Sequence, residues 1–178
     1  ISEGESGKFL ANGFQNSLPT SIGLSYQFWK LRYTAIHASL TAPELKTEKI
    51  NNIDGQRNFV DKFWVSHRFE LDLTENFSLW YNENTVYSNR SIDLNYVNPF
   101  SFLRPIEHEL GDRDNALITL GAKYRMPSFG LKIFADILLD EWQVSKLTTD
   151  WWGNNHGIML GLTQVNDLLT WHSEFVAI

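Results

Sequence analysis

Apolar and polar residues alternate with a period of two along several stretches of the chain. The clearest are Phe63–Leu73, Ala116–Met126 and Leu131–Leu139, where one set of alternate positions is almost wholly apolar. The intervening positions include charges of both signs, as at Arg68 and Glu70. Successive side chains of a β-strand point to opposite faces of a sheet, whereas a helix repeats its apolar residues every three to four positions. The pattern therefore predicts β-strands with one apolar face and one polar face.

Eight strands follow from this reading of the whole chain. They cover about residues 20–29, 31–41, 62–73, 77–87, 115–126, 131–141, 157–165 and 168–178. Short connections join them in pairs, and most of these contain the Asn, Asp, Gly or Pro residues that tight turns need. The connections between the pairs are long, at about 42–61, 88–114 and 142–156. Residues 1–19, rich in Gly, Ser and Asn, are expected to form an N-terminal loop segment.

This alternation of short and long connections is typical of outer-membrane β-barrels, which have short periplasmic turns and long outer loops. The predicted strand lengths agree, because a tilted membrane strand needs about 9–11 residues. Aromatic residues gather near both ends of the strands, as in a pair of aromatic belts, although they also favour strands in general. We therefore predict an all-β fold: an antiparallel up-and-down transmembrane β-barrel, or a contiguous part of a larger one.

A soluble lipocalin-like barrel is the alternative fold for the same strands. The two folds differ in the direction of the apolar side chains, which point outward in a membrane barrel and inward in a soluble one. The residues that decide between them are Phe69, Leu71, Ile133 and Ile137.

Composition narrows the function classes. The chain has 178 residues, enough for a single domain, and a net charge of -6, which argues against nucleic acid as the main partner. No apolar run approaches the roughly 18 residues of a transmembrane helix. Cysteine is absent, so neither disulfides nor thiolate chemistry is available. No signal peptide stands at the N-terminus, so Ile1 is expected to begin either a mature protein or a piece of a longer one.

Charged side chains on the polar faces of the predicted strands are the first candidates for function. They are Arg68, Glu70, Asp72, Glu83, Lys123, Arg125, Asp136 and Asp140. One interpretation is a lumen that binds or passes a polar solute. The other is a barrel interior filled by salt bridges, which the mixture of signs favours because opposite charges pair and leave little net field.

Segment 88–114 is expected to be a long ordered loop, because its many apolar residues would form an aggregation-prone patch if exposed. Pro99, with Asn98 as the cap, suits the start of a short helical turn that Pro105 would end. We expect the segment to fold inward or over the barrel mouth. Its charged tail, Glu107–Asp114, would then meet cations of the polar faces. Those cations are Arg68, Lys123 and Arg125.

The same segment holds the densest group of possible metal ligands. Asp112, Asp114 and Asn115 offer oxygen atoms to Ca²⁺, but a full calcium loop needs more ligands in register. His108 with its two glutamate neighbours does not have a zinc spacing, which requires a pair of histidines one helical turn apart. The histidines are scattered, and no Gly-x-Ser-x-Gly motif is present. We therefore expect no metal, no cofactor and no enzyme activity.

Several short motifs between Phe63 and Glu141 resemble the capsule assembly protein Wzi family, a group of outer-membrane β-barrels. They are His67-Arg68-Phe69-Glu70, Asn76-Phe77-Ser78-Leu79, Glu83, Tyr87, the run Leu94-Asn95-Tyr96-Val97-Asn98-Pro99-Phe100, His108, Gly111-Asp112-Arg113-Asp114-Asn115 and Leu139-Asp140-Glu141. The asparagine-proline piece followed by the glycine-aspartate piece is the most specific part. The resemblance covers nearly half of the chain.

The resemblance implies a bacterial outer-membrane protein that helps to attach or assemble capsular or surface polysaccharide, with a lectin-like role and no enzyme activity. Its implied partners are outer-membrane lipid, surface polysaccharide and other envelope proteins, and no nucleic acid. Family barrels have more than eight strands and carry a periplasmic helical bundle, which this sequence does not show. We therefore interpret the chain as a fragment of such a barrel or as a shorter relative.

Two groups of residues are candidates for ligand contacts. The polar group comprises Glu83, His108, Asp112 and Asp114, and their other interpretation is that they only anchor segment 88–114. The aromatic group comprises Trp151 and Trp152, because flat rings stack on the apolar faces of sugars. The alternative functions are an outer-membrane pore for small polar solutes, a structural subunit of an envelope complex, and a soluble lipocalin-like binding barrel.

Overall fold

The structure is a computed structural model that describes residues 20–43, 59–111, 113–140 and 155–178. The predicted N-terminal loop segment 1–19, Asp112 and the pair Trp151 and Trp152 lie outside these described residues. No helix among the described residues is long and apolar enough to cross a membrane.

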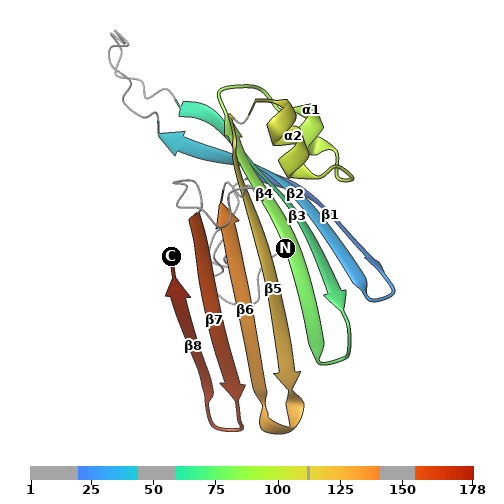
Figure 1. Ribbon diagram of the computed structural model, residues 1–178, viewed down its shortest axis with the longest axis vertical. Helices are drawn as coiled ribbons and strands as arrows, with labels where there is room; N and C mark the ends of the chain where they lie inside the picture. The colour runs from blue at the N-terminus through green and yellow to red at the C-terminus, as the bar shows by residue number, and fades with distance from the viewer. Residues whose placement is uncertain (1–19, 44–58, 112, 141–154) are drawn as a thin grey trace.

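Eight antiparallel strands form one up-and-down sheet, in which each strand pairs with its neighbours in sequence (Figure 1). They are β1 (Thr20–Phe28), β2 (Leu31–Pro43), β3 (Phe59–Asp72), β4 (Phe77–Ser88), β5 (Asn115–Met126), β6 (Leu131–Asp140), β7 (Asn155–Val165) and β8 (Thr170–Ala177). The prediction of an all-β, antiparallel, up-and-down fold is confirmed. The sheet of described strands is open, because β1 and β8 are its two edges.

The short turns are determined by local residues, as the sequence indicated. The Thr74 hydroxyl accepts hydrogen bonds from the backbone N–H groups of Asn76 and Phe77, at 3.2 and 3.0 Å. Gly130 ends the 3₁₀ helix η1 (Pro127–Phe129) with a φ of 58°, a left-handed conformation that favours glycine. A Cβ atom there would also lie 2.0 Å from the carbonyl oxygen of Val165. Each turn therefore sets the register of the hairpin that it closes.

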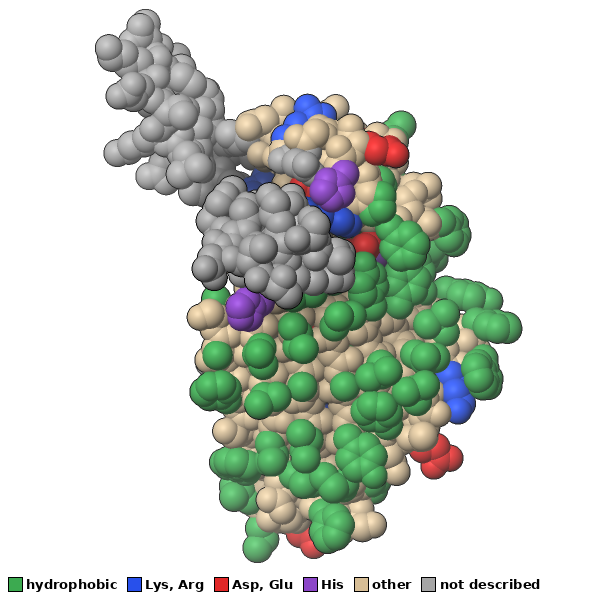
Figure 2. Space-filling model, viewed as in Figure 1, with side chains coloured by type: hydrophobic (Ala, Val, Ile, Leu, Met, Phe, Trp, Pro, Cys, Tyr) green, Lys and Arg blue, Asp and Glu red, His purple; other side chains and the backbone are tan. Residues whose placement is uncertain are grey.

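The sheet is curved, and its convex face is apolar. Cross-strand register places Leu71, Leu79, Ala122 and Leu160 in line on this face, from β3 to β7. Figure 2 shows apolar side chains spread over the strands on this side. The large apolar residues exposed on it are Ile22, Leu24, Tyr26, Phe28, Leu31, Leu79, Leu120, Tyr124, Ile133, Ile137, Ile158, Leu160, Trp171 and Phe175.

The concave face is polar, and most of its central side chains are buried, including Arg68, Glu70 and Lys123. The polarity is therefore the reverse of that in a soluble barrel. Ile133 and Ile137, which were to decide between the two folds, are each 42% exposed and point outward. Phe69 and Leu71 share the convex face with them and are half-buried.

Segment 88–114 contains two short helices, α1 (Leu94–Val97) and α2 (Leu103–Glu109). Asn98 does cap a turn at Pro99, since its side chain accepts the Phe100 N–H at 3.1 Å and its carbonyl accepts the Ser101 N–H at 3.3 Å. The prediction that this turn is helical, continues to Leu103 and is ended by Pro105 is wrong. Asp93 caps α1, since its side chain accepts a hydrogen bond from the Asn95 N–H at 3.1 Å. Pro105 lies within the first turn of α2, where backbone N–H groups have no acceptor inside the helix and proline is tolerated.

The helices lie against the convex face, near one end of β4 (Figure 1). The prediction that the segment folds inward onto the polar faces is wrong, and so are the contacts expected with Arg68, Lys123 and Arg125. Arg68 and Lys123 bind Glu70 on the opposite face, and Arg125 donates to the Glu75 carbonyl. Tyr96 and Leu103 of the segment are buried against the apolar side of the sheet, where burial removes hydrocarbon surface from water. The expectation that the segment hides its apolar residues is wrong for several large ones, which are exposed: Ile92, Leu94, Val97, Phe100 and Phe102.

Candidate functional site

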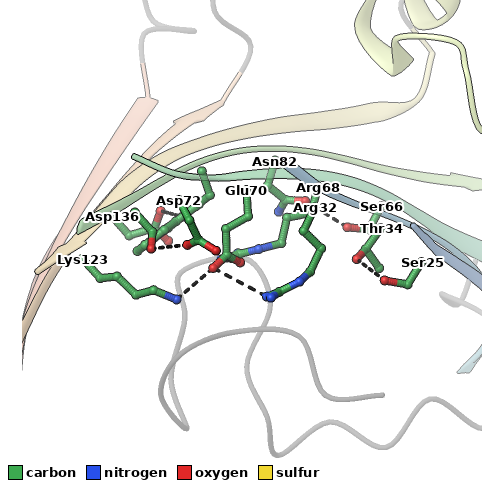
Figure 3. A network of polar contacts seen from close by, with 12 residues as sticks. Ser25, Arg32, Thr34, Ser66, Arg68, Glu70, Asp72, Asn82, Lys123 and Asp136 are labelled. Carbon is green, nitrogen blue, oxygen red and sulfur yellow. Dashed lines mark hydrogen bonds and ion pairs between the residues drawn. The ribbon is translucent and has the colours of Figure 1, made fainter. Parts of the chain in front are cut away.

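A network of polar side chains covers the centre of the concave face, and we call it the polar wall (Figure 3). Its centre is the carboxylate of Glu70 on β3, which three cations approach: one from β2, one from β3 itself and one from β5. The Nζ atom of Lys123 lies 2.8 Å from it, Arg68 lies 3.5 Å away and Arg32 lies 3.8 Å away. Glu70, Arg68 and Lys123 are all buried. The prediction of a salt-bridged wall is confirmed for these residues.

Aromatic rings lie beside this ion cluster. The indole N–H of Trp80 donates to Asp136 over 3.2 Å, and the Arg68 guanidinium lies 4.9 Å from the centre of the Trp80 ring. The ring covers Gly121 of the adjacent strand so closely that a Cβ atom there would be 2.1 Å from it. Phe134 covers Gly161 in the same way. Because these two glycines have no side chain, the two rings can lie flat on the wall above them.

Neutral hydroxyl and amide groups continue the wall away from the ions. The Ser66 hydroxyl donates to the Asn82 side-chain oxygen over 3.0 Å. The hydroxyl oxygens of Ser25 and Thr34 are hydrogen-bonded at 3.3 Å. Asn84 follows on the same face of β4 and is 2% exposed, yet neither its amide nitrogen nor its oxygen has a hydrogen-bond partner. An unpaired buried polar group costs about 1–3 kcal/mol. Asn84 therefore carries one unused donor group and one unused acceptor group on the polar wall.

The wall combines three cations, Arg32, Arg68 and Lys123, and three carboxylates, Glu70, Asp72 and Asp136, with amide, hydroxyl and aromatic groups. Paired charges leave little net field to attract or repel a small ion. Amide groups exchange hydrogen bonds with hydroxyls, and flat rings receive apolar sugar faces. The chemistry of the wall therefore suits a neutral, hydroxyl-rich ligand better than a simple ion.

Glu83 does not belong to the polar wall, which corrects the sequence prediction. It lies on the convex face, in register with His67 of β3 and Ile118 of β5, and is 3% exposed. Its carboxylate accepts the Leu103 backbone N–H at 2.8 Å and the Tyr81 hydroxyl at 2.5 Å. Leu103 is the first residue of α2, so Glu83 holds the start of that helix on the sheet.

Asp114 closes segment 88–114 on itself. Its two oxygens accept a paired contact from the Arg90 guanidinium, at 2.9 and 2.6 Å, and the Tyr96 hydroxyl also donates to it at 2.8 Å. Burial and the hydrogen bond to Asp114 raise the pKa of Tyr96, and the same carboxylate raises the pKa of Arg90. Arg90 also lies 4.7 Å from the centre of the Tyr87 ring. For Asp114 the structure thus matches the anchoring interpretation.

The other predicted ligand residues do not join a common site. His108 is exposed on α2, and Glu83 and Asp114 make their contacts with different parts of the segment. Asp112, Trp151 and Trp152 lie outside the described residues. Among the residues that are described, no group of three or more His, Asp or Glu side chains is arranged to hold a metal ion.

The polar wall is the site that the sequence identified only in part. The sequence prediction included Arg68, Glu70 and Lys123 on the strength of alternation. It missed Arg32, Trp80, Asn82, Asn84 and the two glycines. The signal for them was positional, because all lie at alternate positions that share a face with Arg68 and Glu70. Comparisons of the chain with protein-family models, with curated proteins and with solved structures found no match.

Proposed function

We propose that this chain forms part of the wall of a bacterial outer-membrane β-barrel that takes part in the attachment or assembly of surface polysaccharide. The observation that carries the proposal is the reversed polarity of the sheet. Its convex face exposes large apolar side chains, whereas its concave face buries charged and amide groups. Lipid outside and water inside a barrel require this distribution.

Energetics support the membrane environment. Each Å² of apolar surface left in water costs about 25 cal/mol, so a face with this many exposed apolar residues is unfavourable in water. On β5 and β6 the residues that share the convex face carry no charge, as the rows through Leu120 and Ile137 and through Tyr124 and Ile133 illustrate. A lipid-facing surface must lack charges there, because a charged side chain near the bilayer midplane costs about 2–4 kcal/mol.

The polysaccharide role rests on two supports. The first is the resemblance of the motifs between Phe63 and Glu141 to the Wzi family. The second is the chemistry of the polar wall, where the unpaired amide of Asn84 lies on the same strand and the same face as Trp80 and Asn82. A sugar hydroxyl that exchanges hydrogen bonds with Asn84 would remove the cost of its burial.

The membrane part of the proposal is tested by location and by gel migration. The chain, fused to a secretion signal and expressed in a Gram-negative host, is expected in the outer-membrane fraction after detergent extraction. Its band should shift between unheated and boiled samples, because folded barrels resist detergent until heated. Recovery of folded protein in the soluble periplasm would contradict the proposal.

The polysaccharide part is tested with an array of bacterial capsular and O-antigen polysaccharides. The detergent-solubilised protein should bind at least one of them, and Asn84→Ala should weaken that binding by about tenfold, the effect of losing one good hydrogen-bonding group. Asn95→Ala, on the exposed side of α1, is the matched control and should bind normally. Steady conductance across a planar bilayer without binding to the array would favour the pore instead.

A further inference from the structure

The segment that carries α1 and α2 has two apolar sides. Its inner side is buried: Tyr96 and Leu103 pack with Phe63, Val65 and Tyr87 of the sheet. Its outer side exposes a second set of large apolar residues, which are Ile92, Leu94, Val97, Phe100 and Phe102. A segment that served only to cover the sheet would need a polar outer side, since exposed apolar groups favour association. The outer set therefore requires a partner of its own.

The outer set adjoins the apolar band of the convex face. The Phe102 ring lies 6.2 Å from the ring of Phe69 on β3, and the Tyr33 hydroxyl of β2 donates to the Pro99 carbonyl. Leu31 and Leu79, which are cross-strand partners of Leu71 on the same face, are exposed. The exposed apolar surface thus passes from the strands onto the segment without a polar border at this point.

Charged side chains of the segment form ion pairs, so the segment can lie next to an apolar partner. Arg90 pairs with Asp93 and Asp114, and Arg104 pairs with Glu107 over 2.5 Å. His108 and Glu109, which are exposed, stand at the C-terminal end of α2 rather than beside Phe100. Paired charges cost less to bring near hydrocarbon than isolated ones.

From these observations we infer that the outer side of the segment is a lipid-facing surface, with Leu94 and Phe100 inserted at the boundary between headgroups and acyl chains. The inference rests on the proposed function, since it extends the lipid-facing band of the barrel onto a helical element. Helices that lie at this boundary bury their apolar face about 5–10 Å deep. Leu94 and Phe100, at 79% and 85% exposure, are the residues best placed to enter it. Lipid fits better than a second copy of the chain, because the surface is continuous with the apolar band of the convex face.

The absence of cysteine allows a direct test by site-specific labelling. Three single-cysteine variants, Phe100→Cys, Ile137→Cys and Glu109→Cys, are labelled with bimane. Each is reconstituted in vesicles of phosphatidylcholine and phosphatidylglycerol that contain lipid with a nitroxide either near the headgroup or deep in the acyl chain. Heat-modifiable migration of every variant verifies that it is folded.

The label at position 100 should be quenched about twofold more by the shallow nitroxide than by the deep one, as expected of an interfacial residue. The label at position 137, on the band itself, should be quenched by the deep nitroxide, and the label at 109 by neither. Quenching at 137 without quenching at 100 would overturn this inference and leave the proposed function intact. Quenching at neither position would overturn both.

A second copy is distinguished by cross-linking. Under oxidation in vesicles at low protein density, unlabelled Phe100→Cys should remain monomeric on a gel without reductant, because lipid surrounds residue 100. Formation of a disulfide-linked dimer, together with protection of residue 100 from both nitroxides, would assign the surface to a neighbouring copy and would overturn the inference.

Discussion

The convex face of the sheet differs between its two halves. Over β6–β8 no other described residue covers it, and it is built largely from aliphatic residues such as Ile133, Ile137 and Leu160. Over β3 and β4 the helical segment covers it, and the residues beneath include His67 and Glu83, both buried. One curved sheet thus presents aliphatic groups where no described residue covers it and hydrogen-bonding groups where the helical segment does.

The difference shows what decides residue type on this face. A polar side chain is tolerated only where it finds partners, and the segment supplies them. His67 bonds the Ser101 carbonyl at 3.0 Å, and Glu83 accepts the Leu103 N–H at 2.8 Å. In lipid neither group would have a partner, and an unpaired polar group there costs several kcal/mol. The covered half therefore depends on the segment, whereas the bare half depends on its surroundings.

A charge on the bare half should have the largest effect. Ile137→Arg is expected to destabilise the folded protein in vesicles by about 2–4 kcal/mol, the cost of a cation at the depth of the lipid-facing band. Urea unfolding followed by heat-modifiable migration measures the loss. Leu138→Arg, one residue on and therefore on the concave face, is the control and should cost much less. Equal losses for the two variants would mean that the faces do not differ in environment.

Loss of the ion pair between Arg90 and Asp114 should have the second-largest effect on stability. Arg90→Met leaves the buried Asp114 carboxylate with only the Tyr96 hydroxyl among the contacts described above, at an expected cost of about 1.5–3 kcal/mol. Arg90→Lys keeps the charge but not the paired geometry, so it should recover part of the loss. The free energy of unfolding in urea measures both variants. Unchanged stability in Arg90→Met would show that the segment holds its place without this closure.

Removing the carboxylate beneath α2 tests the covered half directly. Glu83→Leu deprives the Leu103 N–H and the Tyr81 hydroxyl of their acceptor, so we expect a loss of about 1–3 kcal/mol. Glu83→Gln keeps one acceptor oxygen and should lose less. Limited proteolysis within residues 88–111 is the sharper measurement, because release of α2 from the sheet should speed cleavage in Glu83→Leu only. A leucine variant that resists cleavage like the parent would show that this half tolerates an aliphatic residue.

Alternation predicted the sheet but not the position of the segment. Strands and turns follow from local residues, which is why the eight strands could be predicted closely. Glu83 was assigned to the polar wall on its charge, although it shares its face with Leu79 and Tyr81. The period of two was the better signal, since a partner from elsewhere in the chain can satisfy one charge on an apolar face.

Contacts across strands could not be predicted in the same way. The packing of the Trp80 ring on Gly121 depends on the register between β4 and β5. That register is a property of the two strands together and cannot be predicted from the sequence of either strand alone. The unpaired amide of Asn84 likewise appears only when its neighbours are assembled. Residues of this kind make up much of the polar wall, so the sequence identified most of its charges, although not Arg32, and missed its neutral groups.

The smallest predicted effect lies at the border of the helical segment, where Phe102 meets Phe69 of β3. Their ring centres are 6.2 Å apart with planes inclined by 31°, a geometry worth about 0.5–1.5 kcal/mol beyond simple burial. A double-mutant cycle of Phe69→Ala and Phe102→Ala should give a coupling energy in this range. The same cycle with Phe100→Ala in place of Phe102→Ala should give nearly none, because Phe100 is 85% exposed. Coupling as strong at Phe100 as at Phe102 would mean that the segment lies on the sheet differently, with Phe100 turned inward and the border displaced along the strands.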